Sequence, residues 1–591
     1  MQYLNGTDLS NMFKAGTITV MKKRKLLNDL NVFPVPDGDT GNNLVYTMQT
    51  IINDAKTYSS FHDTLDSMSE SALIGARGNS GIIFAQFVNG LRMASKGKSE
   101  VDISDFSEMA QMSVVYVYGA LEEPVEGTMI TVIKDWANFL NDHKNIYTSV
   151  KDILLNAFEE AKKSLERTTE ILKVLKKNKV VDSGAMGFVL FLEGFNRYLN
   201  HEVLEFGETE ELTFGEEHHF HEEVIHRYCT EGLVRYHTYD EEILKNELSK
   251  FGDSLITAKG KELFRVHIHT NTPVDVFETL GKYGTILMQK VDDMVLEVQT
   301  SNSTKKIALV TDSIADIDLN FALENDVFVI PINILLNGTS YLDKYTINNE
   351  VLFNKIKAKI EYPTTAMPEV KYIKNLLNRL VSKYDNVLIM TVAKNLSGTY
   401  QTIRSVSDEY QKDQNIFVLD TLNNSATQGL LVQRAAMLIK EGKSFEEIIQ
   451  VIEEEKHHTK ILVCLDTFKY AMMSGRVPKA VGKIGMAIGL RPIMSLTPEG
   501  KGTAFGFALS KKGITNKIKK LVSEVIETKG ISSYAIVHCQ NEEMALEYQN
   551  IFTEMIGKAP QYVTEISSAT AIHSGLGSVA IGYITSEGVK K

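Results

Sequence analysis

"NVFPVPDGDTGNNL", residues 31–44, places Asp37 and Asp39 one residue apart in a stretch whose prolines and glycines oppose a helix. Two carboxylates at positions i and i+2 of an irregular loop can converge on one cation. Hard divalent ions such as Mg²⁺ prefer carboxylate oxygens and commonly accompany phosphate. The alternative interpretation is an Asp-Gly turn on a solvent-exposed loop. The rest of the chain has to decide between the two.

Length and composition indicate a multidomain globular protein. The 591 residues exceed what one hydrophobic core supports, so about two to four domains are expected. The hydrophobic fraction of 43% and the charged fraction of 23% are typical of soluble proteins. The net charge of −12 argues against nucleic acid as the main partner. It does not exclude ATP, because the field at a local site can oppose the net charge.

Signals for export, membrane insertion and disulfide bonding are not evident. The N-terminal stretch through "MKKRKLLNDL" lacks the apolar run of a signal peptide. No segment has about 18 uninterrupted apolar residues, so we do not expect an integral membrane protein. Cys229, Cys464 and Cys539 are too few for a disulfide framework, and a reducing, cytoplasmic location is expected.

Periodicity divides the chain into segments of different character. Residues 1–200 are predicted to be nearly all helical, because apolar residues recur with a 3.6-residue period. An acidic, His-rich stretch at 200–224 indicates a boundary. Residues 225–299 mix short strand-like segments with one helical pattern near "PVDVFETLGKYG". "QTSNSTKK", residues 299–306, is expected to be a polar linker.

The remaining residues change in style from 306 onward. Short apolar, β-branched runs such as "KIALVTD", "DNVLIMTV", "NIFVLDT" and "SYAIVHC" alternate with helical patterns, which predicts a mostly parallel α/β sheet. We therefore expect three parts: a helical domain (1–200), a small α+β middle domain (201–300) and an α/β half (301–591).

Four loops of small and polar residues each lead into an amphipathic helix in the first part. They are "DGDTGNN" (37–43), "GARGNSG" (75–81), "PVEGT" (124–128) and "VVDSGAMG" (180–187). Helix N-termini attract anions, and glycine lets a phosphate approach the backbone closely. Each loop taken singly is explained by ordinary helix capping. Four of them beside a paired-aspartate loop predict a nucleotide-phosphate site, with Mg²⁺ held by Asp37 and Asp39, and the P-loop signature is not present.

These segments together, "NVFPVPDGDTGNN", "GARGNSG", "EPVEGT" and "VVDSG", closely resemble the ATP-binding domain of the dihydroxyacetone kinase family, and specifically its fatty acid kinase branch. The resemblance implies an all-α helical barrel with ATP at one end and Mg²⁺ on Asp37 and Asp39. The residues that it places around the nucleotide are Thr40, Asn42, Asn43, Ser80, Gly81, Thr128, Asp182 and Gly184. Dihydroxyacetone kinases carry a third aspartate where this chain has Asn31 or a neighbour, so the third Mg²⁺ ligand stays open.

Cys229 in "YCTEGL" and His267 and His269 in "VHIHTN" form a second constellation. Side chains at i and i+2 of a strand share a face, so both imidazoles can reach one metal. One Cys and two His suit Zn²⁺, with a fourth ligand still to be found. The alternative is a half-buried strand with two satisfied histidines and a buried thiol. Both segments also resemble the middle domain of fatty acid kinases, which implies a zinc site with a structural role.

Two loops of the α/β half resemble the anion loops of the first domain. "PTTAMP", residues 363–368, offers Thr364 and Thr365, and Pro368 is well placed to begin a helix. "NLSGTYQ", residues 395–401, follows a predicted strand, where ligands of open α/β sheets commonly bind. For either loop alone, capping and a turn are an equally good explanation.

The α/β half as a whole resembles the DegV family of fatty-acid-binding proteins over residues 306–585. The motifs that carry the likeness are "IALVTDSIADI", "TTAMP", "LSGTYQ", "LDTLNNSATQGLLV", "MMSGRV", "RPIMSL" and "HSGLG". It implies an acyl chain in an apolar tunnel, with the carboxylate bound by Thr365, Ser397 and His573 and Arg476 nearby. The family's usual Thr-Ser-Gln-Pro is Thr-Ala-Met-Pro here, which leaves part of the head-group site undefined.

The two resemblances together imply a fatty acid kinase in which the ATP-binding protein and the lipid carrier are joined in one chain. The reaction would convert ATP and a fatty acid into ADP and acyl phosphate. A carboxylic acid is already ionised at neutral pH, so no general base is required. The catalytic need is alignment and positive charge, from Mg²⁺ and from Arg476 or Arg77.

Two other functions remain open from the sequence. The chain is then either a lipid-binding or regulatory protein with an inactive nucleotide domain, or a kinase of a small hydroxylated substrate with glycerone kinase activity. The partners expected are ATP, a fatty acid and, transiently, a membrane acyltransferase. A homodimer is expected because a linker of about eight residues reaches at most roughly 25–30 Å, which favours transfer between chains. The acyl chain length remains undetermined.

Overall fold

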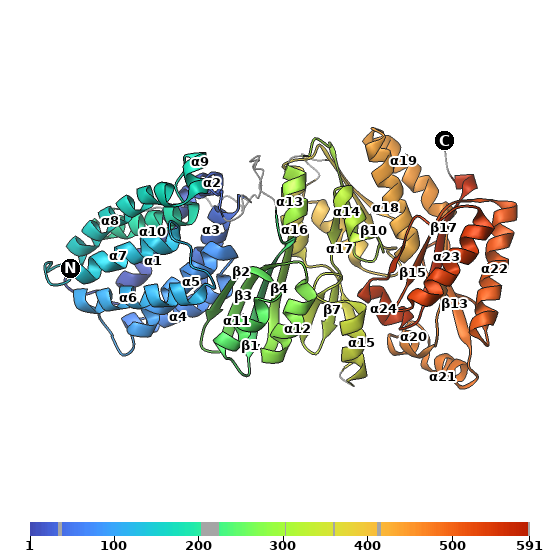
Figure 1. Ribbon diagram of the computed structural model, residues 1–591, viewed down its shortest axis with the longest axis horizontal. Helices are drawn as coiled ribbons and strands as arrows, with labels where there is room; N and C mark the ends of the chain where they lie inside the picture. Colours follow the sequence, from blue (N-terminus) through green and yellow to red (C-terminus); the bar gives the residue numbers. More distant parts are fainter. Residues whose placement is uncertain (34–37, 203–223, 302, 359–360, 411–414, 589–591) are drawn as a thin grey trace. The chain divides into compact units, whose positions relative to one another are not determined.

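The protein is described from a computed structural model, in residues 1–33, 38–202, 224–301, 303–358, 361–410 and 415–588 (Figure 1). The chain divides into two compact units, Met1–Asn302 and Ser303–Lys591, and each is described by itself. Most of the predicted boundary at 200–224 lies outside the described residues. In the described ranges, every helix is too short or too polar to span a lipid bilayer.

The first unit begins with a bundle of helices, as the 3.6-residue periodicity predicts. Their bounds are α1 Gly6–Lys22, α2 Arg24–Asp29, α3 Thr40–Asp54, α4 Phe61–Gly75, α5 Gly78–Ala94, α6 Ile103–Ala120, α7 Met129–His143, α8 Val150–Ile171, α9 Lys173–Asn178 and α10 Ser183–Leu199. The four helices expected after small, polar loops are α3, α5, α7 and α10, and each begins within or directly after its loop. The prediction of an all-helical first domain is therefore confirmed.

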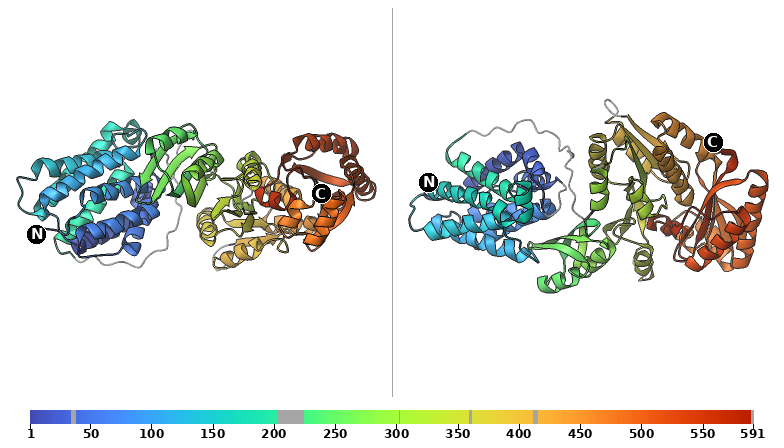
Figure 2. Two further views of the ribbon diagram at one scale, coloured as in Figure 1. Left: turned by 90° about the horizontal axis from the view of Figure 1, so that it is seen from below. Right: turned by 45° about the horizontal axis from the view of Figure 1, so that its top comes forward.

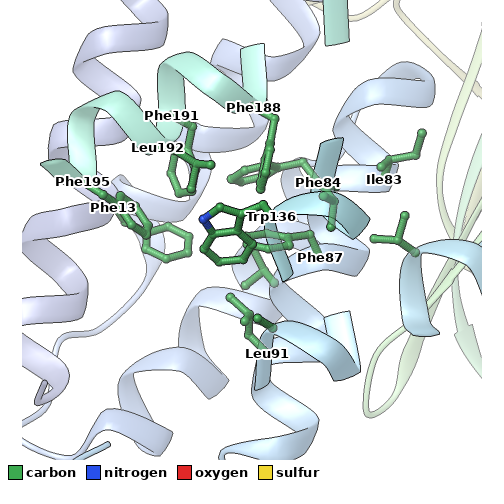
Figure 3. Close-up of a cluster of buried hydrophobic side chains, with 14 of the residues drawn as sticks. Phe13, Ile83, Phe84, Phe87, Leu91, Trp136, Phe188, Phe191, Leu192 and Phe195 are labelled. Atoms are coloured by element: carbon green, nitrogen blue, oxygen red, sulfur yellow. The ribbon is translucent and has the colours of Figure 1, made fainter. Parts of the chain in front are cut away.

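Trp136 of α7 lies at the centre of the helical core (Figure 3). Its ring meets Phe87 of α5, Phe106 of α6 and Phe188 of α10 edge-on, with centroid separations of 6.0, 6.1 and 5.9 Å. Each such pair contributes about 0.5–1.5 kcal/mol beyond the burial of apolar area. These contacts fix the four helices against one another, and so they also fix the positions of their first turns.

The middle of the chain forms a four-stranded antiparallel sheet in the order β2-β3-β1-β4. Its elements are β1 Tyr228–Tyr236, α11 Glu241–Leu248, β2 Gly252–Lys259, β3 Leu263–Thr270, α12 Pro273–Tyr283, β4 Gly284–Asp293 and α13 Met294–Ser301. The sequence predicts only α12 among these helices. Since α13 reaches Ser301, the first residues of the predicted linker are helical, and that part of the prediction is wrong.

The two faces of the middle sheet have different neighbours. On one face α12 lies so close that a β-carbon on Gly232 would be 2.8 Å from the Leu280 side chain. On the other face Leu233, Ile256 and Ala258 belong to the same hydrophobic core as the helical bundle. Figure 2 accordingly shows the green strands at one end of the blue and teal helices. The middle sheet therefore packs directly on the domain that carries the predicted nucleotide loops.

In the residues described for it, the second unit is α/β and has three sheets. A parallel sheet has the order β11-β10-β5-β6, a larger sheet the order β14-β13-β12-β17-β15-β16, and a small one the order β8-β7-β9. The strands are β5 Ile307–Asp312, β6 Val327–Ile330, β7 Asn333–Leu336, β8 Thr339–Leu342, β9 Thr364–Ala366, β10 Asn386–Thr391, β11 Asn415–Asp420, β12 Thr459–Cys464, β13 Arg491–Leu496, β14 Gly502–Ala508, β15 Ile531–His538, β16 Val563–Glu565 and β17 Val579–Thr585. The helices are α14 Leu319–Glu324, α15 Asn349–Lys357, α16 Val370–Val381, α17 Thr399–Ser407, α18 Ser425–Lys440, α19 Phe445–Glu455, α20 Lys469–Met473, α21 Lys479–Ala487, α22 Lys511–Thr528, α23 Glu542–Ile556 and α24 Ser568–Ser574.

The strand directions correct one expectation. A mostly parallel arrangement is right for β5, β6, β10 and β11 and wrong for the six-stranded sheet, in which only β15 and β16 are parallel. Short β-branched runs show that a strand is buried, but they do not show which way its neighbour runs. Here β13 and β14 form a hairpin, and β17 inserts antiparallel between β12 and β15.

Candidate functional site

The first turns of four helices meet at one place in the helical domain. A β-carbon built on Gly78, at the start of α5, would lie 2.4 Å from Asn43 Nδ2 on α3. One built on Gly184, at the start of α10, would lie 3.2 Å from Ser80 Oγ of α5 and 3.1 Å from the Met129 side chain of α7. The N-terminal ends of α3, α5, α7 and α10 are therefore adjacent, as a phosphate site built from helix starts requires.

The aspartate loop leads into this place. Asp39 is the N-cap residue of α3, yet its side chain makes no capping hydrogen bond with the helix. The ordinary capping explanation therefore does not account for this carboxylate. Asp37 lies outside the described residues, so the expected pairing of the two carboxylates on Mg²⁺ stays a prediction.

Three predicted nucleotide residues, Thr40, Asn42 and Asn43, lie buried in the first turn of α3. Thr40 Oγ1 donates a hydrogen bond of 2.8 Å to Asn31 Oδ1, so the residue at the third-aspartate position supports α3. Asn42 Oδ1 is buried and has no hydrogen-bond partner among the described residues. A buried carbonyl oxygen without a partner is costly, and a bound ion or water that approaches it would remove that cost.

Asp182 and Thr128 both bond within their own loops, and Asp182 caps α10 as the capping interpretation expects. Asp182 Oδ2 accepts the N–H of Ala185 at 2.8 Å, and backbone groups of α7 and α10 also face this carboxylate. Burial raises the pKa of Asp182 to about 6. Thr128 Oγ1 donates to Val125 O at 2.9 Å. Both residues shape the helix starts, and Gly81, whose N–H bonds Arg77 O at 3.0 Å, closes the first turn of α5.

Cys229, His267 and His269 come together on one face of the middle sheet. Cys229 pairs with His269 across β1 and β3, and the ligand atoms of all three residues lie within 4.8 Å of one another. Cys229 Sγ is 3.8 Å from His267 Nδ1. The prediction that these three side chains share a face is confirmed.

The donor set fits Zn²⁺. His267 Nε2 is buried and has no hydrogen-bond partner in the described part of the chain, which leaves it available to a metal. Burial lowers the pKa of His269 to about 3, so its imidazole is neutral at pH 7, the form that binds metals. Asp253 Oδ1 lies 3.8 Å from His269 Nδ1, so a carboxylate also borders the cluster. The fourth ligand stays open.

The three residues are not remote from the aspartate loop. Burial raises the pKa of the Cys229 thiol well above its usual value, and the negative charge of Asp39 acts in the same direction. The geometry agrees, because Glu231, two residues from Cys229, accepts the N–H of Gly78 at 3.1 Å, and a β-carbon on Gly78 would lie 2.4 Å from Asn43 Nδ2 on α3. The sequence alone offers no sign of this proximity, because the two residues belong to different domains.

In the second unit, two of the expected carboxylate-binding residues, Ser397 and His573, lie near Arg476, which was expected close by. Ser397 lies in the loop between β10 and α17, and its Oγ is 2.8 Å from Thr399 Oγ1. Arg476 Nη2 reaches Leu396 O of the same loop at 3.5 Å. Burial lowers the pKa of His573 on α24 to about 4, and the charge of Arg476 lowers it further. His573 Nδ1 is buried without a partner among the described residues, and the ring is neutral at pH 7.

Thr365 has a different setting from the one expected. Its segment forms the short strand β9, which pairs with β7, and α16 begins at Val370 rather than at Pro368. The expectation of a helix-start loop here is wrong, because the segment pairs as a strand with the edge of β7. Met367 Sδ still lies against Gly398, where a β-carbon would be 2.6 Å away, so the Thr365 segment borders the Ser397 loop.

Three family models match the chain in consecutive segments. A DAK2 domain matches residues 34–197, a FakA-like middle domain of fatty acid kinases matches residues 225–301, and a model described as an uncharacterised protein of the DegV family matches residues 306–586. This domain content matches a fused fatty acid kinase. The fold classes expected for the three parts are confirmed with it.

Curated relatives match about half of the chain. An uncharacterised protein of Staphylococcus epidermidis is 35% identical over 306 residues, which are 49% of this chain and 55% of the relative. A protein of Staphylococcus haemolyticus is 34% identical over 306 residues, with the same two coverages. The chain therefore spans about half the length of the curated relatives it matches.

Solved structures of the DegV family are similar to about half of the chain. The one from Thermus thermophilus, described as showing fatty acid binding, covers 47% of this chain and 99% of its own, with a TM-score of 0.44 and 24% identity. DegV of Bacillus subtilis, described as a fatty acid binding protein, covers 48% of this chain and 100% of its own, with a TM-score of 0.43 and 23% identity.

If Cys229, His267 and His269 hold a zinc ion, the purified protein should contain about one zinc per chain, and a strong chelator should lower its melting temperature. Cys229→Ser should lower the zinc content because the thiolate ligand is lost. The matched control is Cys464→Ser, because Cys464 is a buried cysteine of the second unit. A metal-free protein whose melting temperature the chelator does not change would contradict the zinc site. It would favour the alternative of two satisfied histidines and a buried thiol.

Arg476→Gln is expected to weaken fatty acid binding about tenfold or more, because hydrogen bonds to charged groups contribute about 1.5–3 kcal/mol. Arg404→Gln on the exposed side of α17 is the control. Since His573 has a pKa of about 4 and stays neutral above it, affinity should not change between about pH 6 and pH 8 through this residue. Equal binding by the wild type and Arg476→Gln would remove Arg476 from the carboxylate site.

Proposed function

We propose that the chain is a fatty acid kinase, which transfers the γ-phosphate of ATP to the carboxylate of a fatty acid held by the DegV-family half. The observation that carries the proposal is the convergence of four helix starts beside Asp39, in a chain that also contains a fatty acid kinase-like middle domain and a DegV-family half. The gathering of Ser397, Arg476 and His573 supports a carboxylate as the acceptor rather than a hydroxyl group.

Charge repulsion is the main obstacle to this reaction. Both the carboxylate and the γ-phosphate are anions at pH 7, so the nucleophile needs no general base. Two unit negative charges 4 Å apart repel by about 4 kcal/mol at an effective dielectric constant of about 20. One well-placed cation therefore offsets the repulsion. Alignment of the two anions supplies the rest of the catalysis.

On the nucleotide side, Asp39 and Asp37 would hold Mg²⁺, which neutralises phosphate charge when bound. The N–H groups of Asn79 and Ser80 belong to the first turn of α5, where backbone donors have no intrahelical acceptor. Arg77 precedes them, and its guanidinium carbon lies 3.6 Å from the centre of the Tyr46 ring. This stacking holds a fixed positive charge beside the helix start.

On the lipid side, Arg476 is the cation of the proposed carboxylate site and Ser397 supplies a hydroxyl donor. The neutral His573 adds a hydrogen-bonding group without charge. A carboxylate held by one arginine and neutral donors stays nucleophilic, because its charge is balanced only in part.

Asp39→Asn is expected to reduce acyl-phosphate formation by about 100-fold or more, because it removes a charged Mg²⁺ ligand. The fatty acid should remain bound, since it is held by the other half of the chain. Asp54→Asn, at the exposed far end of the same helix, is the control. Acyl-phosphate formation and native mass spectrometry of the bound lipid measure the two effects. Near wild-type formation by Asp39→Asn would remove the magnesium site from the account.

Transfer between chains is tested by mixing Asp39→Asn protein with Ser397→Ala/Arg476→Ala protein. Each variant alone should be nearly inactive, because each lacks one of the two sites. Recovered activity after the chains have exchanged is expected if one chain of a homodimer phosphorylates the acid held by its partner. A mixture as inactive as its components, with exchange verified, would mean that transfer occurs within one chain.

A further inference from the structure

A buried ion pair lies on the face of the middle sheet that packs on the helical domain. Arg265 Nη2 on β3 donates to Glu231 Oε2 on β1 at 2.7 Å, and the exposed fractions of the two side chains are 2% and 0%. Burying two charges costs several kcal/mol per ion before their attraction repays it. Apolar residues of similar volume would serve a plain core at least as well, so this pair calls for a more specific explanation.

Each member of the pair also holds one side of the turn between α4 and α5. Glu231 Oε1 accepts the N–H of Gly78, the first residue of α5, at 3.1 Å. Arg265 Nη1 donates to Ile74 O in the last turn of α4 at 3.1 Å. The carboxylate thus satisfies a donor that the helix start leaves open, and the guanidinium satisfies an acceptor that the helix end leaves open.

The clamped turn is the "GARGNSG" loop, residues 75–81. Gly78 has a φ of 56°, a conformation that side chains rarely adopt, and a β-carbon there would strike Asn43 of α3. Residue 78 must therefore be glycine, and a glycine by itself makes the backbone of the turn more flexible. A turn that requires this flexible residue, and that must still keep a fixed position, needs contacts with residues outside the turn.

The contacts of Glu231 and Arg265 with the α4–α5 turn, which we call the clamp, also determine which backbone N–H groups remain for a ligand. Because Glu231 takes the N–H of Gly78, the first-turn donors of α5 left for a phosphate are those of Asn79 and Ser80. Lys290 Nζ lies 3.7 Å from Glu231 Oε1 and 2.5 Å from Asp292 Oδ2. Arg265 and Lys290 therefore both lie beside Glu231, which limits its repulsion of an anion bound at the neighbouring N–H groups.

We propose that Glu231 and Arg265 are positioning residues of the nucleotide site, through which the middle domain fixes the first turn of α5 for the phosphates of ATP. This inference rests on the proposed function. It makes the middle domain a part of the nucleotide site in addition to a carrier of the candidate zinc site.

The test replaces both charges at once, in Glu231→Leu/Arg265→Met, because removing a buried pair together leaves no unpaired charge. The control is Arg227→Met/Asp293→Leu, which removes a 2.7 Å ion pair between the residue before β1 and the last residue of β4. Isothermal titration with the magnesium complex of a non-hydrolysable ATP analogue measures affinity. Hydrogen exchange of the segment 73–81 measures the turn, and zinc content and melting temperature are recorded for every variant.

The clamp predicts about tenfold weaker nucleotide binding and a similar rise in the KM for ATP with little change in kcat, since uniform binding is lost. Exchange in segment 73–81 should be faster, while fatty acid binding stays as in the wild type. Glu231→Gln, which keeps an acceptor for the N–H of Gly78, should give an intermediate affinity and serves if the double variant does not fold.

Nucleotide affinity and exchange equal to the wild type in the double variant would overturn the clamp while leaving the proposed function standing. If the double variant does not fold, wild-type values in Glu231→Gln would do the same. A wild-type chain that binds no nucleotide would overturn the proposed function itself, and the clamp with it.

Discussion

Four helix N-termini can meet at one place only if their backbones approach closely, and the rest of the helical domain follows from that constraint. A β-carbon at Gly78 or Gly184 would sit 2.4–3.2 Å from a side chain of a neighbouring helix. The aromatic core around Trp136 then supplies the rigidity that the glycines do not, since it joins α5, α6, α7 and α10 a few turns away. Small residues let the helix starts approach one another, and the large residues behind them hold the helices in place.

The middle domain belongs to the same arrangement. Its sheet shares a hydrophobic core with the bundle, and the same face carries the metal-binding candidates and the Glu231–Arg265 pair side by side. The pairing of Glu231 with His267 across β1 and β3 follows from the same register that pairs Cys229 with His269. A change of register by one residue would move all of these side chains to the opposite face. The candidate zinc site and the α4–α5 turn therefore depend on one strand alignment.

Local sequence signals predict some of these features and not others. The starts of α3, α5, α7 and α10 were predictable because small, polar loops before apolar periodicity mark helix N-termini. The shared face of His267 and His269 was predictable from the two-residue period of a strand. The structure of Thr364–Ala366 was not, because the partner that makes it a strand, β7, lies some thirty residues away in the chain. The roles of Glu231 and Arg265 were also hidden, since a single charged residue in a strand gives no sign of the turn it will contact. Period-two spacing from Cys229 to Glu231 was the one available hint.

The central claim is that this chain phosphorylates a carboxylate. ³¹P NMR of the purified protein with magnesium and ATP, supplied in turn with a long-chain fatty acid and with dihydroxyacetone, tests it most directly. The account predicts an acyl-phosphate resonance and stoichiometric ADP with the fatty acid, and none with dihydroxyacetone. A phosphate ester of dihydroxyacetone, or no turnover of ATP in the presence of bound fatty acid, would contradict it.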